Sequence, residues 1–120
     1  MKKLITGVLV ASTVVACGGG GGGGEPAAIV TVAVFRTLGS TQCQGGGTTA
    51  ATLQNALINA GVEVVAASCG LDGVFRAPVC GTSDGKIGVF DVATEHLSIA
   101  TALGFSLLTT LPNAQRQPCG

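Results

Sequence analysis

Seven consecutive glycines, Gly18 to Gly24, limit what this chain can fold into more than any other feature. Such a run cannot pack into a core and has no preferred conformation, so we expect a flexible tether that spans on the order of 15 Å as a random coil. A glycine run can instead cradle a phosphate, but that needs a strand before it and a helix after it. Here Glu25 and Pro26 follow. The run therefore separates a short N-terminal segment from one small domain, residues 26–120.

The N-terminal segment has the organisation of a secretory signal peptide. Lys2 and Lys3 precede an apolar run from Leu4 to Ala16. A basic start, an apolar stretch of about a dozen residues and small residues at its end are typical of a cleaved signal, and such a run is too short to span a bilayer as a mature helix. We therefore expect residues 1–16 to be removed on export.

The end of this segment, Val14-Val15-Ala16-Cys17, resembles the lipobox of bacterial lipoproteins: an apolar residue, a tolerant position, a small residue and then the cysteine. The resemblance covers residues 1–17. It implies that Cys17 is lipidated and becomes the first mature residue, with 17–25 as the lipidated cysteine and its tether. In that family a residue other than Asp after the cysteine usually directs the protein to the outer membrane, and Gly18 implies that location, facing the periplasm.

The charge of the mature part argues against a nucleic-acid partner. Lys2 and Lys3 leave with the signal, so four basic residues stand against six acidic ones, a net charge of −2. The basic residues form no cluster, and the sequence has no Trp or Tyr to stack on bases. The charged residues are Arg36, Arg76, Lys86 and Arg116, with Glu25, Glu63, Asp72, Asp84, Asp91 and Glu95.

Four cysteines follow Cys17: Cys43, Cys69, Cys80 and Cys119. An even number in a small exported domain indicates two disulfides, which would staple a thin core. No two of them have the C-x-x-C spacing of a zinc site or a thioredoxin-type pair, and His96 is the only histidine. We therefore expect no metal site among them.

The strand predictions rest on runs of apolar and β-branched residues. The strongest run is AIVTVAVF, residues 28–35, which is typical of a strand covered on both faces. VFRAPV, from Val74 to Val79, is an expected edge strand because Pro78 lacks the N–H that a central strand needs. The remaining predicted strands are VEVVAAS (62–68), IGVFDV (87–92) and SLLTTL (106–111), the last ended by Pro112 before a polar tail.

Two helices are expected between these strands. Thr48 or Thr49 caps the first helix, and Gly61 ends it. The second runs from Thr94 to Leu103, where Gly104 supplies a left-handed stop after which Phe105 folds back. The apolar face of the first helix consists of Leu53, Ala56, Leu57 and Ala60, and that of the second of Ile99, Ala100 and Leu103.

The order of elements is β-α-β-(β)-β-α-β, in which the bracketed strand is 74–79. This alternation predicts an α+β sandwich with two helices on one face of a mainly antiparallel sheet, and the split βαβ, ferredoxin-like plan is the natural candidate.

That plan suggests which cysteines pair. The first two strands run parallel, so Cys43 and Cys69 lie at the same end of the sheet. A strand at 74–79 would carry Cys80 roughly 20 Å away, beyond the reach of Cys69. We therefore expect Cys43–Cys69 and Cys80–Cys119. If 74–79 is only a loop, Cys69–Cys80 becomes the local alternative.

Candidate catalytic residues are few. His96 lies beside Glu95, and the sequence marks no nucleophile or second acid to act with it. Asp84, Asp91 and Glu95 match no calcium loop, and turn or helix-start positions explain the two aspartates. No serine lies in a G-x-S-x-G elbow, and P-loop and dinucleotide motifs are absent. We expect a partly exposed structural histidine, no enzyme activity and no cofactor. The alternative is a small periplasmic enzyme, which would need a pocket in which His96 converges on a carboxylate.

The two halves of the domain, 33–67 and 87–109, each follow the pattern strand, helix, glycine, strand. In the first, Val32-Ala33-Val34-Phe35 precedes Leu53, Leu57 and Ala60-Gly61-Val62; in the second, Gly88-Val89-Phe90 precedes Ile99, Leu103 and Gly104-Phe105. This pairing resembles the SPOR domain, a βαββαβ envelope module, and the resemblance implies binding to peptidoglycan glycan strands. The four cysteines and the long loops 37–47 and 70–85 depart from that family.

Together these patterns predict a membrane-anchored cell-envelope lipoprotein whose disulfide-stapled α+β domain acts as a binding or structural module. Besides the membrane that holds the lipid, an envelope protein or peptidoglycan is the expected partner.

Overall fold

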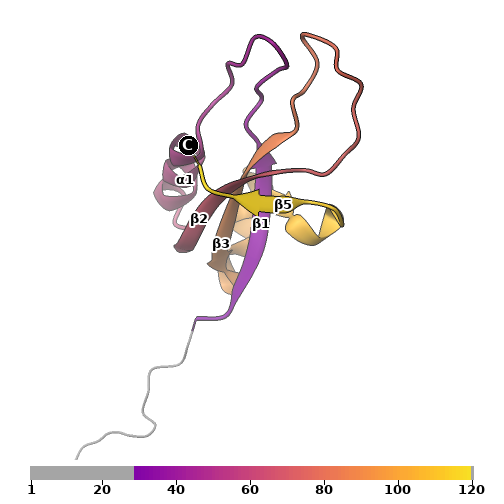
Figure 1. Cartoon of the computed structure of the whole chain (residues 1–120). Coiled ribbons are helices and arrows are strands. Elements are labelled where there is room, and N and C mark those ends of the chain that lie inside the picture. The colour runs from indigo at the N-terminus through magenta and orange to yellow at the C-terminus, as the bar shows by residue number, and fades with distance from the viewer. Residues whose placement is uncertain (1–28, 120) are drawn as a thin grey trace, which may run out of the picture.

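The structure, a computed structural model, describes residues 29–119. The predicted signal peptide (1–16), the predicted lipidation site Cys17 and the predicted glycine tether lie outside the described residues. A single turn of 3-10 helix, Thr94–His96, precedes the second α-helix, and another, Leu108–Thr110, follows the fourth strand. The strands and α-helices of residues 29–119 are β1 (Thr31–Thr37), α1 (Ala50–Asn59), β2 (Val64–Leu71), β3 (Lys86–Ala93), α2 (Leu97–Ala102), β4 (Ser106–Leu107) and β5 (Gln115–Gln117) (Figure 1).

The strands of the described chain form one sheet in the order β4-β1-β3-β2-β5, and every neighbouring pair is antiparallel. The first four strands have the order 4-1-3-2 of the split βαβ plan, so the prediction of a ferredoxin-like α+β fold is confirmed. β1 and β2 flank β3 and run in the same direction. Both therefore end at one end of the sheet, the loop end, and the chain enters β1 at the opposite, N-terminal end (Figure 1).

One face of the sheet packs against the two helices. Side chains alternate along a strand, so Val34 of β1 and Phe90 of β3 face this side together. The rings of Phe90 and Phe105 meet edge to face, with centroids 5.7 Å apart. A Cβ on Gly88 would lie 3.0 Å from the Phe90 ring, so a glycine at this position makes room for it. The buried core cluster is Val34, Leu53, Leu57, Val62, Phe90, Val92, Ala100 and Phe105.

The helix boundaries follow the predicted capping residues. The Thr49 hydroxyl accepts the Thr52 N–H at 3.1 Å and caps α1. Gly104, at φ +94°, follows the end of α2, and the Phe105 N–H donates to the Ala100 carbonyl at 3.1 Å. This is the Schellman arrangement expected from the sequence, and it turns Phe105 back into the core.

The other face of the sheet is covered by the chain that follows β4. β4 forms one edge of the sheet. From there, residues 108–114 lead across this face to β5, which pairs with β2 and forms the opposite edge. Leu111 lines a hollow together with Ala33 of β1, and Arg116 donates two hydrogen bonds to Asp91 of β3, at 2.9 and 3.0 Å. We call residues 108–117 the strap. The predicted strand 106–111 is only two residues long, because the chain turns at once into a 3-10 helix.

Residues 74–79 form no strand, so the predicted edge strand is wrong. Gly73, at φ +74°, turns the chain out of the line of β2. The Arg76 guanidinium then hydrogen-bonds back to the Asp72 carboxylate and to the Val74 carbonyl. The segment therefore stays at the loop end of the sheet, within the loop 72–85.

The prediction of two disulfides is confirmed, but the predicted pairings Cys43–Cys69 and Cys80–Cys119 are wrong, and so is the alternative Cys69–Cys80. The structure joins Cys43 to Cys80 and Cys69 to Cys119, with Cα–Cα distances of 5.2 and 4.8 Å. Because no strand carries the chain away after Gly73, Cys80 stays beside the loop that holds Cys43. β5 pairs Gln117 with Cys69, and this brings Cys119 within reach of Cys69.

Candidate functional site

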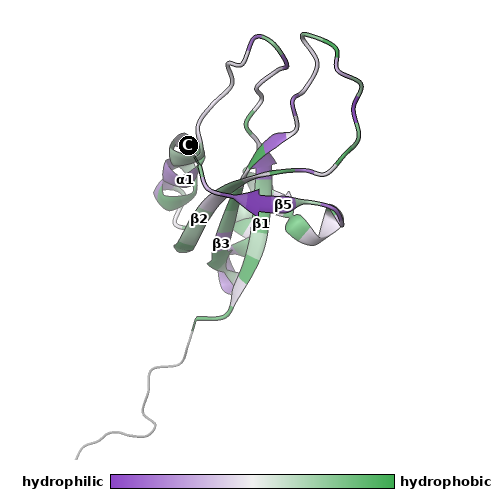
Figure 2. Cartoon of the chain, viewed as in Figure 1, coloured by the Kyte–Doolittle hydropathy of each residue, from purple (hydrophilic) through white to green (hydrophobic). Residues whose placement is uncertain are grey.

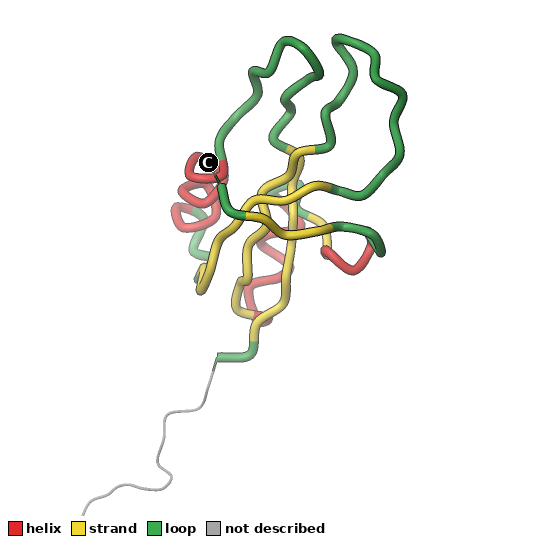
Figure 3. Tube along the Cα trace, viewed as in Figure 1, coloured by secondary structure: helices red, strands yellow, loops and turns green. Residues whose placement is uncertain are grey.

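Two long loops leave the loop end of the sheet side by side (Figure 3). Residues 38–49 connect β1 to α1, and residues 72–85 connect β2 to β3. The Gln42 N–H donates to the Thr82 carbonyl at 2.8 Å, and the Gly81 N–H donates to the Gln42 carbonyl at 3.1 Å. We call the two joined loops the loop platform.

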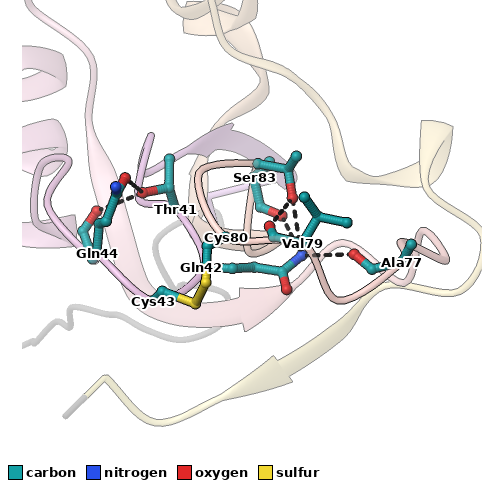
Figure 4. Close-up of a disulfide and its surroundings, with 10 residues drawn as sticks. Thr41, Gln42, Cys43, Gln44, Ala77, Val79, Cys80 and Ser83 are labelled. Carbon is teal, nitrogen blue, oxygen red and sulfur yellow. Dashed lines mark hydrogen bonds between the residues drawn. A yellow bond between two sulfur atoms is a disulfide. The ribbon is translucent and has the colours of Figure 1, made fainter.

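Gln42 and its neighbour Cys43 fasten one loop to the other (Figure 4). The Gln42 side-chain amide lies 3.1 Å from the Ala77 carbonyl, 3.1 Å from the Thr82 hydroxyl and 3.3 Å from the Ser83 carbonyl, as a donor to each. The Cys43–Cys80 disulfide adds a covalent link beside these bonds. The loop 72–85 thus has defined attachments although residues 74–79 belong to no helix or strand.

A bidentate ion pair closes the base of the same loop. The two Arg76 amino groups donate to the two Asp72 oxygens at 2.9 and 2.7 Å. This bonding holds the pKa of the Asp72 carboxyl below its usual range, against the opposing effect of burial. Gly85 has φ +81°, a conformation that favours glycine, and a Cβ there would lie 2.9 Å from an Arg76 amino group.

A small polar pocket of about 240 Å³ opens between the loops. Its polar side chains are those of Gln42, Asp72, Arg76, Ser83 and Asp84. Burial raises the pKa of the Asp84 carboxyl, but the hydrogen bond from the Lys86 N–H, at 3.0 Å, and the positive charge of Lys86 lower it, so that the net shift is downward. Asp72 and Arg76 neutralise each other, which leaves the Asp84 carboxylate as the remaining charge of the lining.

The outer part of the loop 72–85 presents apolar side chains to solvent. Phe75 is 91% exposed, and Val74 and Val79 are each about half exposed. Phe90 and Phe105, by contrast, are fully buried. Arg76, the charged residue of this segment, is turned back onto Asp72. We call Val74, Phe75 and Val79 the apolar tip; it belongs to the loop at the upper right of Figure 2.

The titratable residues considered from the sequence lie in three separate places. Arg76 and Asp84 line the platform pocket, and Asp91 pairs with Arg116 of the strap. His96 lies at the N-terminal end, where its Nδ1 accepts the Glu63 N–H at 3.0 Å and ties the start of α2 to the start of β2. The other ring nitrogen, Nε2, lies 3.7 Å from a Glu95 oxygen.

Within residues 29–119, no group of three or more His, Cys, Asp or Glu side chains is placed to hold a metal ion. The described segment also contains no helix that combines the length and the apolar character needed to cross a bilayer.

Sequence reasoning missed the two residues that define the platform, Gln42 and Phe75. Phe75 lay inside a predicted edge strand, where half of its surface would be covered. Gln42 has no motif around it. One signal was available in the sequence. Each of the two loops contains a cysteine, and parallel strands bring these loops to the same end of the sheet. This placement would have favoured the pairing Cys43–Cys80.

Comparison of the chain with protein-family models, with curated protein sequences and with solved structures found no match.

Proposed function

We propose that this chain is an exported lipoprotein, anchored through Cys17, whose domain is a binding module that uses the loop platform to contact a protein partner in the cell envelope. The observation that carries this proposal is the apolar tip: an almost fully exposed phenyl ring on a loop held by a disulfide, an ion pair and Gln42. An isolated exposed aliphatic residue needs no explanation, whereas a protruding aromatic ring flanked by two valines is typical of a contact surface.

The defined conformation of the loop platform is a second argument that the apolar tip binds a partner. A loop that is already ordered loses less conformational entropy when a partner immobilises it. Aromatic residues at the centre of an interface commonly provide much of the binding free energy. The Cys43–Cys80 link and the Gln42 hydrogen bonds hold the loop that carries Phe75 before any partner arrives.

The chemistry of the tip suits an apolar pocket on the partner. Between Gly73 and Thr82, Arg76 is the only charged residue, and Asp72 neutralises it. Inserting the tip into a pocket would therefore desolvate no free charged side chain.

A photoreactive phenylalanine at position 75 of the full-length protein in intact cells tests this proposal, with the same probe in place of the exposed Asn55 of α1 as the control. We expect a discrete protein adduct from position 75, none from position 55, and loss of the adduct when Cys43 and Cys80 are both replaced by serine. Equal adducts from both positions, adducts with lipid alone, or an adduct unaffected by removal of the disulfide would refute it.

A second candidate is binding to peptidoglycan glycan strands, which the SPOR resemblance implies. The strand order 4-1-3-2 with a helix in each half favours it. Co-sedimentation of the Cys17→Ser protein with purified peptidoglycan distinguishes the two. Retention that is insensitive to Phe75→Ala would favour the glycan, and absence of retention would remove this candidate.

A further inference from the structure

A second exposed apolar surface lies at the N-terminal end of the domain, opposite the loop platform. Val30 is 73% exposed, and Ile29, Ile58 and Val65 are each about half exposed. We call these four residues the apolar rim. They come from the chain that enters β1, from the last turn of α1 and from the start of β2. In Figure 2 the segment that leads into β1 at this end is green, the colour of hydrophobic residues.

Hydrogen bonds hold the starts of β1 and β2, which carry Ile29, Val30 and Val65, next to the end of β3. The Thr94 N–H and hydroxyl both donate to the Val30 carbonyl, at 2.9 and 3.0 Å. The Ala93 N–H donates to the Glu63 carbonyl, and the Glu63 N–H donates to His96. The starts of β1 and β2 and the end of β3 therefore form one end surface, with Val30 on one side and Val65 on the other.

The chain outside the described residues joins the domain at this surface. About a dozen residues separate Cys17 from Ile29, and a glycine-rich segment of that length averages roughly 20 Å as a random coil. Its fully extended reach is about 40 Å. A lipid on Cys17 would thus keep the N-terminal end of the domain close to the bilayer, at a high effective concentration of lipid surface.

We propose that the apolar rim rests on the surface of the membrane that holds the lipid anchor, so that the loop platform points away from that membrane. This inference relies on the proposed lipidation of Cys17. It orients the domain: four aliphatic side chains contact the interfacial region of the bilayer, and Phe75 at the opposite end is free to meet a partner.

The charges at this end specify the kind of lipid. Glu63 is exposed, and the Glu95 side chain is 79% exposed. Arg36, Arg76 and Lys86 lie toward the loop end, whereas Arg116 of the strap binds Asp91 of β3. The rim therefore favours zwitterionic headgroups and is repelled by anionic ones, unlike a surface that binds membranes through a basic patch.

The absence of Trp from the sequence allows single tryptophan probes. Val30→Trp and Phe75→Trp variants are purified with their lipid and inserted into phosphatidylcholine vesicles with brominated acyl chains. We expect Val30→Trp to lose most of its fluorescence relative to unbrominated vesicles, and Phe75→Trp to lose little. Val65→Trp is a second probe of the rim. Mixing in phosphatidylglycerol should weaken quenching of Val30→Trp, and Glu63→Gln with Glu95→Gln should remove that sensitivity.

Quenching of Phe75→Trp as strong as that of Val30→Trp, or no quenching of either rim probe, overturns the orientation. Stronger quenching in phosphatidylglycerol overturns the charge argument. The mass of each sample reports the anchor separately. A protein that carries the lipid and floats with the vesicles while its rim probes stay unquenched refutes this inference alone, whereas a mass without lipid refutes the proposed lipidation and the inference that depends on it.

Discussion

At the scale of single residues, Gln42 and Arg76 give the loop 72–85 its shape. Each makes side-chain hydrogen bonds to backbone carbonyls of that loop, at Ala77 and Val74 respectively. Such bonds replace the regular ladder that a strand at 74–79 would have provided. They also leave Phe75 outside any packed layer, which is why its ring is exposed.

Replacing Gln42 by Ala tests this role. We expect the free energy of unfolding to fall by about 1 kcal/mol, because hydrogen bonds to loop carbonyls are lost. The amides of residues 77–83 should exchange hydrogen faster, while those of β3 stay protected. Asn55→Ala, at an exposed position of α1, is the matched control and should neither lower the free energy of unfolding nor speed exchange across residues 77–83. Unaltered exchange across residues 77–83 in the Gln42 variant would contradict the assignment.

Asp91 and Arg116 give the strap a pH-dependent contact with the sheet. Hydrogen bonding from Arg116 holds the pKa of the Asp91 carboxyl below its usual range, although burial opposes it. A carboxyl with a lowered pKa in the folded state stabilises the fold above its unfolded pKa, and that contribution is lost as the pH falls through the folded pKa. The affected window therefore lies below about pH 4.

Asp91→Asn should accordingly make the free energy of unfolding less dependent on pH in the acid range. Because the pair is partly exposed, we expect a loss of about 0.5 to 1 kcal/mol at neutral pH and almost none near pH 2. The free energy of unfolding should still depend on pH in this variant, because the pKa values of Asp72 and Asp84 are also lowered. Denaturant titrations of Asp91→Asn, Arg116→Gln and the double variant measure the coupling. If Asp91→Asn lowered the free energy of unfolding equally at pH 2 and pH 7, the loss of the Asp91–Arg116 ion pair would not be the cause.

At the scale of elements, each disulfide secures a part of the chain that has little regular structure. Cys43–Cys80 closes a separation of 37 residues and joins the two loops of the platform. Cys69–Cys119 closes a separation of 50 residues and fixes the end of the strap beside β2. β5 is only three residues long, so its pairing alone is a weak attachment.

Replacing each cysteine pair by serine separates these roles. In the loop-entropy model each disulfide contributes about 4 kcal/mol, so both double variants should lose similar stability. The location of the change should differ. Cys43→Ser with Cys80→Ser should increase hydrogen exchange in the loops 38–49 and 72–85, whereas Cys69→Ser with Cys119→Ser should increase it in the strap and at the outer edge of β2. Identical exchange patterns in the two variants would refute this division.

The elements that sequence reasoning predicted well are those fixed by local patterns. Apolar runs identified β1, β2 and β3, and Thr49, Gly61 and Gly104 marked the helix ends. The strap was missed because β5 is set by pairing with β2 and by a disulfide, both distant in sequence. The segment 74–79 was assigned wrongly because its composition suits a strand, while the contacts of Gln42 and Asp72 decide its conformation. The disulfide pairing failed with it.

At the scale of the whole molecule, the two ends of the domain differ in character. The N-terminal end carries the apolar rim and receives the chain from the proposed anchor, and the loop end carries the platform with Phe75 (Figure 1). Both faces of the sheet between them are covered, one by the helices and the other by the strap. This polarity suits a module that is held at one end and makes contact at the other.

Metabolic labelling with a palmitate analogue tests the proposed anchor most directly, because the orientation and the reach of the platform depend on it. We expect the wild-type protein to be labelled, to lose residues 1–16 and to fractionate with the outer membrane, and we expect Cys17→Ser to remain unlabelled at its full length. Label that persists on Cys17→Ser, or a wild-type protein that matures without any label, would contradict the account.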